Sequence, residues 1–353
     1  MASLTRVAIT SRKIIRYTIY LIIGLIFARI TYIVGTRIYR YFYPEPPPPP
    51  TVAFGKLPAL SFPEKEFPQN LIFTLQTPDL KLPKFPTQEI VYLMPQPAPN
   101  IRAIDQAQQT AQRLGFNPNG RELVETVYLF KRDDAPASLN MNVVSGIFSI
   151  SYDLNSDPSA LDRIPPTPEA ATGIVKGMLQ FSSILPKDLT GPVTTEFLKV
   201  EQGKFIKTFS QSDGDVVKVN LFRKNYNDLP SVPDDPKEAN VWFMVSGAKE
   251  RGHQIIAGEY HYFPVDEEKK ETYPIKTAEE VWEELKAGHA YIASLGENEK
   301  GGEVIVRRVY LAYYDAGQYT GFFQPVVVFE GDNDFAAYVP AVTNQFYGAE
   351  GAE

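Results

Sequence analysis

The apolar sequence IIRYTIYLIIGLIFARITYIV, residues 14–34, separates a short N-terminal tail from the rest of the chain. Ile, Leu, Phe and Val dominate it, and as a helix it would span about 31 Å, close to the hydrocarbon thickness of a bilayer. A buried core helix is the alternative, but a proline-rich segment that cannot fold back compactly comes next. A cleaved signal peptide is the better alternative, but no small-x-small cleavage motif follows the run, and a lipoprotein anchor would need a cysteine, of which the chain has none. We therefore predict an uncleaved signal anchor over residues 14–36.

Basic residues flank this run unequally. Four lie before it or at its start and two follow it, namely Arg6, Arg12, Lys13 and Arg16, then Arg37 and Arg40. Because positive charge is retained on the cytoplasmic side of a membrane, the excess predicts a cytoplasmic tail over residues 1–13 and an extracytoplasmic C-terminal part.

Arg29 lies a little past the middle of the predicted span. An arginine at the bilayer centre costs about 2.5–3.5 kcal/mol on insertion scales, and the surrounding Ile and Leu residues can absorb that cost. One interpretation is that Arg29 is tolerated by snorkelling towards the outer face. The other is that it contacts an acidic or polar group on another transmembrane helix.

A proline-rich segment follows the predicted anchor, with Pro44 and the run Pro46–Pro50 at its centre. Proline fixes φ and has no amide donor, so such a run adopts the polyproline II conformation. We predict a spacer over residues 37–68, which could hold the rest of the chain up to about 75 Å from the membrane at about 3.1 Å per residue. A ligand for an SH3-type domain is the alternative, but the predicted topology places the segment outside the cytoplasm.

The composition limits the partners of the chain. Its net charge is −7, and its first 44 residues contain seven basic and no acidic side chains, so the remainder carries −14. An acidic body of this kind is a poor nucleic-acid binder, and we expect no nucleic-acid partner. The absence of cysteine and of any N-x-[ST] sequon suits an exported bacterial protein that relies on its core rather than on disulfides.

Helix and strand patterns alternate beyond the prolines. The expected helices begin near Ile101, at Pro168 after its cap Thr167, and at the capping box formed by Thr277 and Glu280. Strand patterns follow each helix, at residues 124–131, 141–152, 194–201, 204–211, 216–223, 241–248, 253–263, 303–314, 322–330 and 336–342. We predict an α+β fold in which an N-terminal transmembrane helix precedes antiparallel sheets with helices on one face. A first α+β unit should cover residues 69–165 and a second region residues 166–347.

The last third of the chain contains TAEEVWEELKAGHAYI, then GGEVIVRRVYLAYYDAGQYTGFFQPVVVFEG, then AAYVPAV, within residues 277–343. This tail module resembles the C-terminal part of Yyc-type accessory regulators. The resemblance implies a membrane-anchored, extracytoplasmic protein built of PepSY-like units that modulates a cell-wall sensor kinase. It implies no catalytic residues. The proline-rich residues 51–99 are not part of the resemblance.

Motifs with catalytic or cofactor chemistry are absent from the sequence. There is no G-x-S-x-G, H-E-x-x-H, Walker or dinucleotide-binding glycine pattern. His253 and His261 would lie about 26 Å apart on one strand, too far for a shared metal ion, and Glu259 with His261 is interpreted as a surface pair. We therefore expect no metal, no cofactor and no enzymatic activity, with carboxylates brought together only by folding as the alternative.

Aromatic residues are dense near the C-terminus, and we considered five of them as a partner or ligand surface: Tyr313, Tyr314, Tyr319, Phe322 and Phe323. Such residues usually pack in a core or across strands; exposed ring faces would instead form a groove for an extended peptide or a glycan. Pro325 and Pro340 cannot donate to a ladder, so they place their strands at an edge or a bulge, and a peptide could extend an edge strand.

These observations together predict a single-pass protein anchored in the lipid bilayer through residues 14–36. Its extracytoplasmic body would be a non-catalytic binding or regulatory module of a bacterial cell envelope, with a membrane protein, a peptide or a glycan as its partner. An envelope hydrolase that acts on glycan or peptide through dispersed carboxylates is the alternative, and a structural surface protein is a third possibility.

Overall fold

The computed structural model describes residues 4–42, 48–65, 67–68, 70–298 and 302–349. The chain divides into two units, Met1–Pro49 and Pro50–Glu353, which we call the anchor and the body.

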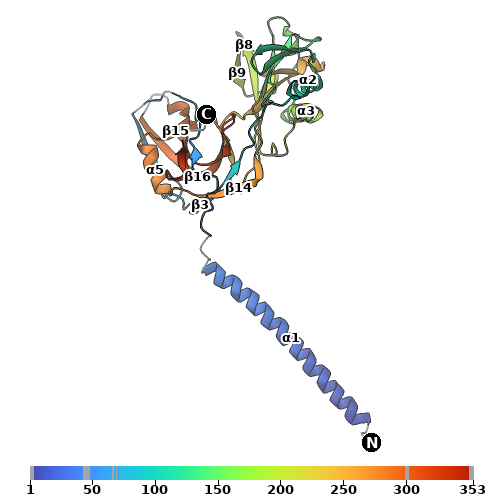
Figure 1. The fold of residues 1–353 in the computed structure, drawn as a ribbon, viewed down its shortest axis with the longest axis vertical. Coiled ribbons are helices and arrows are strands. Elements are labelled where there is room, and N and C mark those ends of the chain that lie inside the picture. Colours follow the sequence, from blue (N-terminus) through green and yellow to red (C-terminus); the bar gives the residue numbers. More distant parts are fainter. Residues whose placement is uncertain (1–3, 43–47, 66, 69, 299–301, 350–353) are drawn as a thin grey trace. The chain divides into compact units, whose positions relative to one another are not determined.

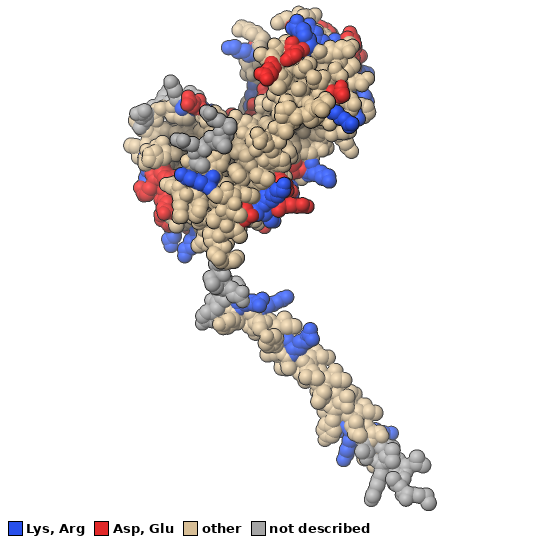
Figure 2. All heavy atoms as spheres, in the orientation of Figure 1, with Lys and Arg blue, Asp and Glu red and all other residues tan. Residues whose placement is uncertain are grey.

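The anchor consists of one helix, α1 (Leu4–Phe42; Figure 1). Its segment Ser11–Arg40 is long and apolar enough to cross a membrane. Thr18 and Thr31 each donate their hydroxyl to the carbonyl oxygen four residues earlier, both at 2.9 Å, so these polar groups are satisfied within the helix. Much of the helix surface shown in Figure 2 carries no charged side chain. The prediction of a single N-terminal helix suited to spanning a membrane is confirmed, and the helix continues beyond residue 36.

The body is mixed α+β with mostly antiparallel sheets, as predicted. Its helices are α2 (Ala103–Arg113), α3 (Pro168–Phe181), α4 (Arg251–Gln254) and α5 (Ala278–Lys286). Its strands up to residue 221 are β1 (Leu57–Pro58), β2 (Leu71–Leu75), β3 (Gln88–Leu93), β4 (Arg121–Val124), β5 (Val127–Lys131), β6 (Ala137–Asn142), β7 (Phe148–Tyr152), β8 (Val193–Glu201), β9 (Lys204–Thr208) and β10 (Val216–Leu221). The later strands are β11 (Ser231–Pro233), β12 (Val241–Ser246), β13 (Ile255–Tyr260), β14 (Asp266–Pro274), β15 (Tyr291–Ser294), β16 (Gly302–Asp315), β17 (Phe322–Phe323), β18 (Pro325–Gly331), β19 (Ala336–Pro340) and β20 (Tyr347–Ala349).

A nine-stranded antiparallel sheet forms the first half of the body, in the order β4-β5-β6-β7-β13-β12-β10-β8-β9. The pairing of β7 with β13 joins two meanders that are distant in sequence. The predicted boundary between residues 165 and 166 therefore falls within one continuous sheet. The helices α2 and α3 bury their apolar stripes in the same hydrophobic cluster as the strands (Figure 1). Thr167 caps α3 by accepting from the Ala170 amide at 3.3 Å, as its sequence predicts.

The second half is built on a six-stranded sheet in the order β11-β16-β18-β19-β15, with β2 added in parallel to β16. Smaller sheets, β14-β3-β17 and β1-β20, complete it. Helix α5 starts at the predicted capping box, in which Thr277 and Glu280 exchange hydrogen bonds.

The prediction that Pro325 and Pro340 mark an edge or a bulge is wrong, because both strands are central and pair with each other without a register shift. Strand β18 lies between β16 and β19, and β19 lies between β18 and β15. Each proline is the terminal residue of its strand, where a missing donor removes no interior ladder bond. Strand addition at these two strands is therefore excluded.

The structure corrects the predicted spacer of residues 37–68. Residues 37–42 continue helix α1, and residues 43–47 lie outside the described residues. Leu57 in β1 is fully buried, and its strand pairs in parallel with β20. Prolines fix an extended backbone, but an extended backbone can also pack against a core. A proline-rich segment acts as a spacer only where it does not pack against the folded body.

Candidate functional site

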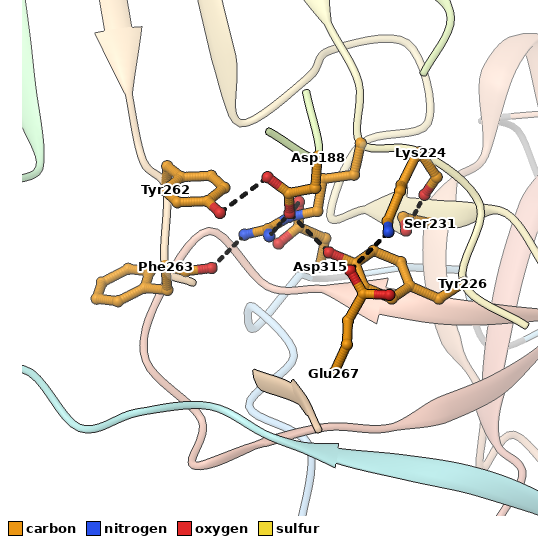
Figure 3. A network of polar contacts seen from close by, with 9 residues as sticks. Asp188, Lys224, Tyr226, Ser231, Tyr262, Phe263, Glu267 and Asp315 are labelled. Atoms are coloured by element: carbon orange, nitrogen blue, oxygen red, sulfur yellow. Dashed lines mark hydrogen bonds and ion pairs between the residues drawn. The ribbon is translucent and has the colours of Figure 1, made fainter. Parts of the chain in front are cut away.

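Arg223 lies where the two halves of the body meet, and its side chain is 2% exposed. Its Nη1 donates to Asp188 Oδ2 at 2.7 Å and its Nε to Asp315 Oδ2 at 2.9 Å. Its Nη2 donates to the carbonyl oxygen of Phe263 at 2.6 Å (Figure 3). Asp188 follows α3 in the first half, whereas Asp315 ends β16 in the second. Arg223 therefore links the two halves through a buried ion-pair network.

Two tyrosines complete this network around Asp188 (Figure 3). Tyr226 donates its hydroxyl to Asp188 Oδ2 at 2.6 Å and Tyr262 to Oδ1 at 2.8 Å. The ring of Tyr262 also lies 4.4 Å from the Arg223 guanidinium. Burial by itself would lower the pKa of Arg223, but the carboxylates of Asp315 and Asp188 outweigh it and raise that pKa. Because its charged groups satisfy one another, we interpret the network as a structural joint rather than a ligand site.

An open cleft of about 620 Å³ lies beside this joint, and we call it the acidic cleft. It is lined by elements of both halves and by the segment Ser61–Pro63. Four of its lining residues are carboxylates, Asp234, Asp235, Glu238 and Glu259, and three carry aromatic rings, Phe62, Trp242 and Phe263. Its volume is in the range of small-molecule and peptide side-chain sites, about 300–1,000 Å³.

Strand register explains how the sheet contributes to this cleft. Trp242 on β12 lies directly opposite Glu259 on β13, so the two side chains share one face of the sheet. Asn220 on β10 lies opposite Trp242 and therefore shares that face too. The neighbouring Phe243 points to the other face, into the cluster that α2 and α3 cover. The sheet thus has one apolar face covered by helices and one polar face that opens into the cleft.

The negative charge of the acidic cleft is only partly neutralised. Glu238 forms an ion pair with Lys218, and Glu259 lies 3.8 Å from His261. Asp235 accepts a hydrogen bond from the backbone amide of Lys237 at 2.9 Å, but it has no ion-pair partner among the residues that the structure describes. The cleft can therefore accept additional positive charge.

Asp234 is one of the half-buried carboxylates of the cleft, and its pKa is raised. Burial raises its pKa, and the effect is partly offset by a hydrogen bond from the Tyr314 hydroxyl and by the charge of Lys65. A hydrolase that uses two carboxyl groups as general acid and general base would need a second carboxyl group with a suitably shifted pKa near Asp234.

The structure places the two histidines of the sequence prediction, His253 and His261, at different sites. His253 lies in α4, where its Nε2 is 3.1 Å from Asp157 Oδ2, while His261 lies at the acidic cleft. Within the described ranges, no group of three or more His, Cys, Asp or Glu side chains could hold a metal ion.

The predicted aromatic ligand surface is largely wrong. Tyr313, Tyr314 and Phe323 are at most 2% exposed and pack in the core. Phe322 is half-buried and lies 5.1 Å from the ring of Phe54. Tyr319 alone of the five keeps an exposed face, 37%, and its ring is 6.4 Å from that of Phe263 at the acidic cleft. Buried aromatic rings cannot be distinguished from exposed ones by their density in a sequence.

Most residues that line the acidic cleft were not predicted from the sequence as site residues. Asp234, Asp235 and Glu238 lie on a loop between β11 and β12, in the sequence VPDDPKEANVW, where Trp242 follows almost at once. The signal that could have found them is a proline-bounded acidic loop leading directly into a strand with an outward-facing tryptophan. Glu259 and His261 join them only through the pairing of β12 with β13.

Comparisons with known proteins show little similarity. No family model and no curated protein matches the chain. An uncharacterised protein from Eubacterium rectale ATCC 33656, with a solved structure, is 11% identical, and the match covers 80% of this chain and 92% of that one with a TM-score of 0.41.

Proposed function

We propose that the chain is a membrane-anchored, non-catalytic binding module that holds a cationic peptide segment in its acidic cleft. The observation that carries this proposal is the set of four carboxylates around Trp242, which neighbouring basic groups neutralise only in part. A lysine or arginine side chain would meet negative charge there, and the rings of Phe62 and Phe263 line the same cleft. The Trp242 ring already faces the Lys218 ammonium, 4.4 Å from its centroid, so a cation is accommodated at this position. The excess of −14 outside the first 44 residues attracts cations to the body over a longer range.

The anchor supports a location at a bacterial membrane. Its apolar helix can span a bilayer, and the excess of basic residues before the span favours a cytoplasmic N-terminus with the body outside. The resemblance of residues 277–343 to Yyc-type accessory regulators supports a regulatory role. In this proposal, a cationic peptide occupies the cleft and the anchor meets a membrane partner.

Pentalysine is a suitable probe for the acidic cleft, with the full chain held in zwitterionic nanodiscs. Trp282→Phe leaves Trp242 as the only tryptophan, so its fluorescence reports on the cleft. We expect pentalysine to change this fluorescence and pentaglutamate to leave it unchanged. In the same background, Asp235→Asn combined with Glu259→Gln should weaken pentalysine binding at least tenfold, since about 1.4 kcal/mol is a factor of ten and two charge-assisted contacts are lost.

Glu279→Gln is the matched control, because Glu279 is an exposed carboxylate of α5 outside the cleft. It should leave the affinity for pentalysine unchanged. Equal affinity of the double variant and the control, or equal binding of pentaglutamate, would contradict the proposed function.

Arg29 provides a test of the membrane partner. It is exposed on α1, and within the described residues no side chain pairs with it. We expect Arg29→Leu to insert into membranes at least as well as the unchanged chain, because a charge is removed from the span. We also expect it to lose a transmembrane partner that crosslinking recovers from the unchanged chain. Arg37→Leu, near the end of the span, is the control that should retain the partner; equal crosslinking yields for all forms would show that Arg29 is only a tolerated charge.

A further inference from the structure

A second cleft, of about 450 Å³, lies between α2, α3 and the segment Arg251–Ile255, and we call it the helix groove. We propose that the helix groove binds a single-chain amphipathic carboxylate, with the alkyl chain on its apolar floor and the carboxylate held by arginines at its rim. This site is distinct from the acidic cleft and takes the opposite charge, so neither proposal depends on the other.

The floor of the groove is apolar. Ile150 on β7 and Leu114 after α2 are buried beneath it, and Ile174 and Met178 on α3 are half-buried along its side. Phe181 at the end of α3 is 68% exposed although it is a large apolar side chain. Ala171, Val175 and Leu179 of α3 are buried in the core, whereas Ile174, Met178 and Phe181 leave apolar surface that lines the groove.

Two glycines keep the groove open. Gly173 and Gly177 are four residues apart on α3, so they share one face of that helix, and both line the groove. A Cβ atom at either position would meet no other atom within 4 Å. The space beside these two positions is therefore open, so an alanine would fit at either glycine, and a longer side chain would extend towards the groove.

Three arginines surround the groove, although they are far apart in sequence. Arg132 is already occupied, because its Nε and Nη2 donate to the two carboxylate oxygens of Asp134 at 2.8 and 3.0 Å, and that pair lowers the pKa of Asp134. Arg113 and Arg251 are exposed, and in the described part of the chain neither has a hydrogen-bond or ion-pair partner. Two guanidinium groups without a partner in the described part of the chain therefore lie beside the apolar floor.

The combination defines the ligand class. A guanidinium binds a carboxylate through two parallel hydrogen bonds, and the apolar floor requires a hydrocarbon attached to that carboxylate. A short carboxylate would leave the floor uncovered, whereas a cationic amphiphile would be repelled by the rim. Each CH₂ group that reaches the floor should raise the affinity about fourfold.

The test uses the full chain in zwitterionic nanodiscs and dodecanoate labelled with ¹³C at its carboxyl carbon. Bound dodecanoate should give a carboxyl resonance that is absent from empty nanodiscs. We expect Arg113→Gln with Arg251→Gln to weaken binding at least tenfold, and Gly177→Leu to abolish it by filling the groove. Leucine is a better helix former than glycine, so that variant should retain the fold, which thermal unfolding checks.

Arg121→Gln is the matched control, because Arg121 is an exposed arginine of β4 that does not line the groove. It should leave dodecanoate binding unchanged, and neither hexanoate nor dodecyltrimethylammonium should displace the bound dodecanoate at the same concentration. Absence of the bound resonance, equal binding by all variants, or displacement by dodecyltrimethylammonium would overturn the proposal.

Discussion

Replacing Arg223 by methionine is expected to lower the free energy of unfolding of the body by about 3–5 kcal/mol. The change removes the positive charge between Asp188 and Asp315 and leaves both carboxylates buried without a counter-ion. It also leaves the carbonyl oxygen of Phe263 without its donor. Denaturant unfolding, followed by tyrosine and tryptophan fluorescence, measures the loss.

Two controls separate this effect from a general loss of charge. Arg308→Met removes an exposed arginine that pairs with Glu330 at 3.0 Å, and it should cost at most about 1 kcal/mol. Combining Arg223→Met with Asp188→Asn and Asp315→Asn should recover part of the stability, because no buried charge is then left unpaired. A single Arg223 variant as stable as the Arg308 variant would show that the joint does not hold the two halves together.

Removing residues 50–68 is expected to destabilise the body by about 5 kcal/mol or more. Leu57 and Leu60 are at most 7% exposed, and the ring of Phe62 is 4.7 Å from those of both Tyr291 and Tyr314. Each such side chain contributes about 1.5–3 kcal/mol when buried. A fragment that begins at residue 50 should therefore unfold cooperatively, whereas one that begins at residue 69 should unfold at much lower denaturant or aggregate.

Leu57→Ala in the longer fragment tests the same contact without shortening the chain. It should cost about 2–5 kcal/mol, as other buried leucine-to-alanine changes do. Exposed Leu80 provides the matched control, since Leu80→Ala should have little effect. Equal unfolding midpoints for the two fragments would mean that the N-terminal segment does not stabilise the body, contrary to its burial.

Local features were predictable from the sequence because they depend on neighbouring residues. The apolar run of α1, the cap Thr167 of α3 and the capping box of α5 all follow from side chains within a few positions of one another. The strand preference of β12 and β16, which are rich in β-branched and aromatic residues, is similarly local.

Strand β14, Asp266–Pro274, shows where local patterns are insufficient. Its sequence DEEKKETYP has a charged first part with low strand preference, yet it pairs with β3 over residues Gln88–Leu93. The hydrogen bonds of that pairing come from a segment almost two hundred positions earlier in the chain, which no window of sequence contains. The packing of residues 51–68 arises in the same way.

The apolar helix that can span a membrane, the α+β class and most helix and strand positions follow from the sequence, because they arise from composition and short-range periodicity. Which side chains meet depends on the tertiary fold. Tyr313 and Tyr314 became core because β16 is central, whereas Glu259 became a neighbour of Trp242 because β12 pairs with β13. Whether a side chain is buried, and which charged groups lie together, depends on contacts between segments that are distant in the sequence. These contacts form only when the strands pair into sheets.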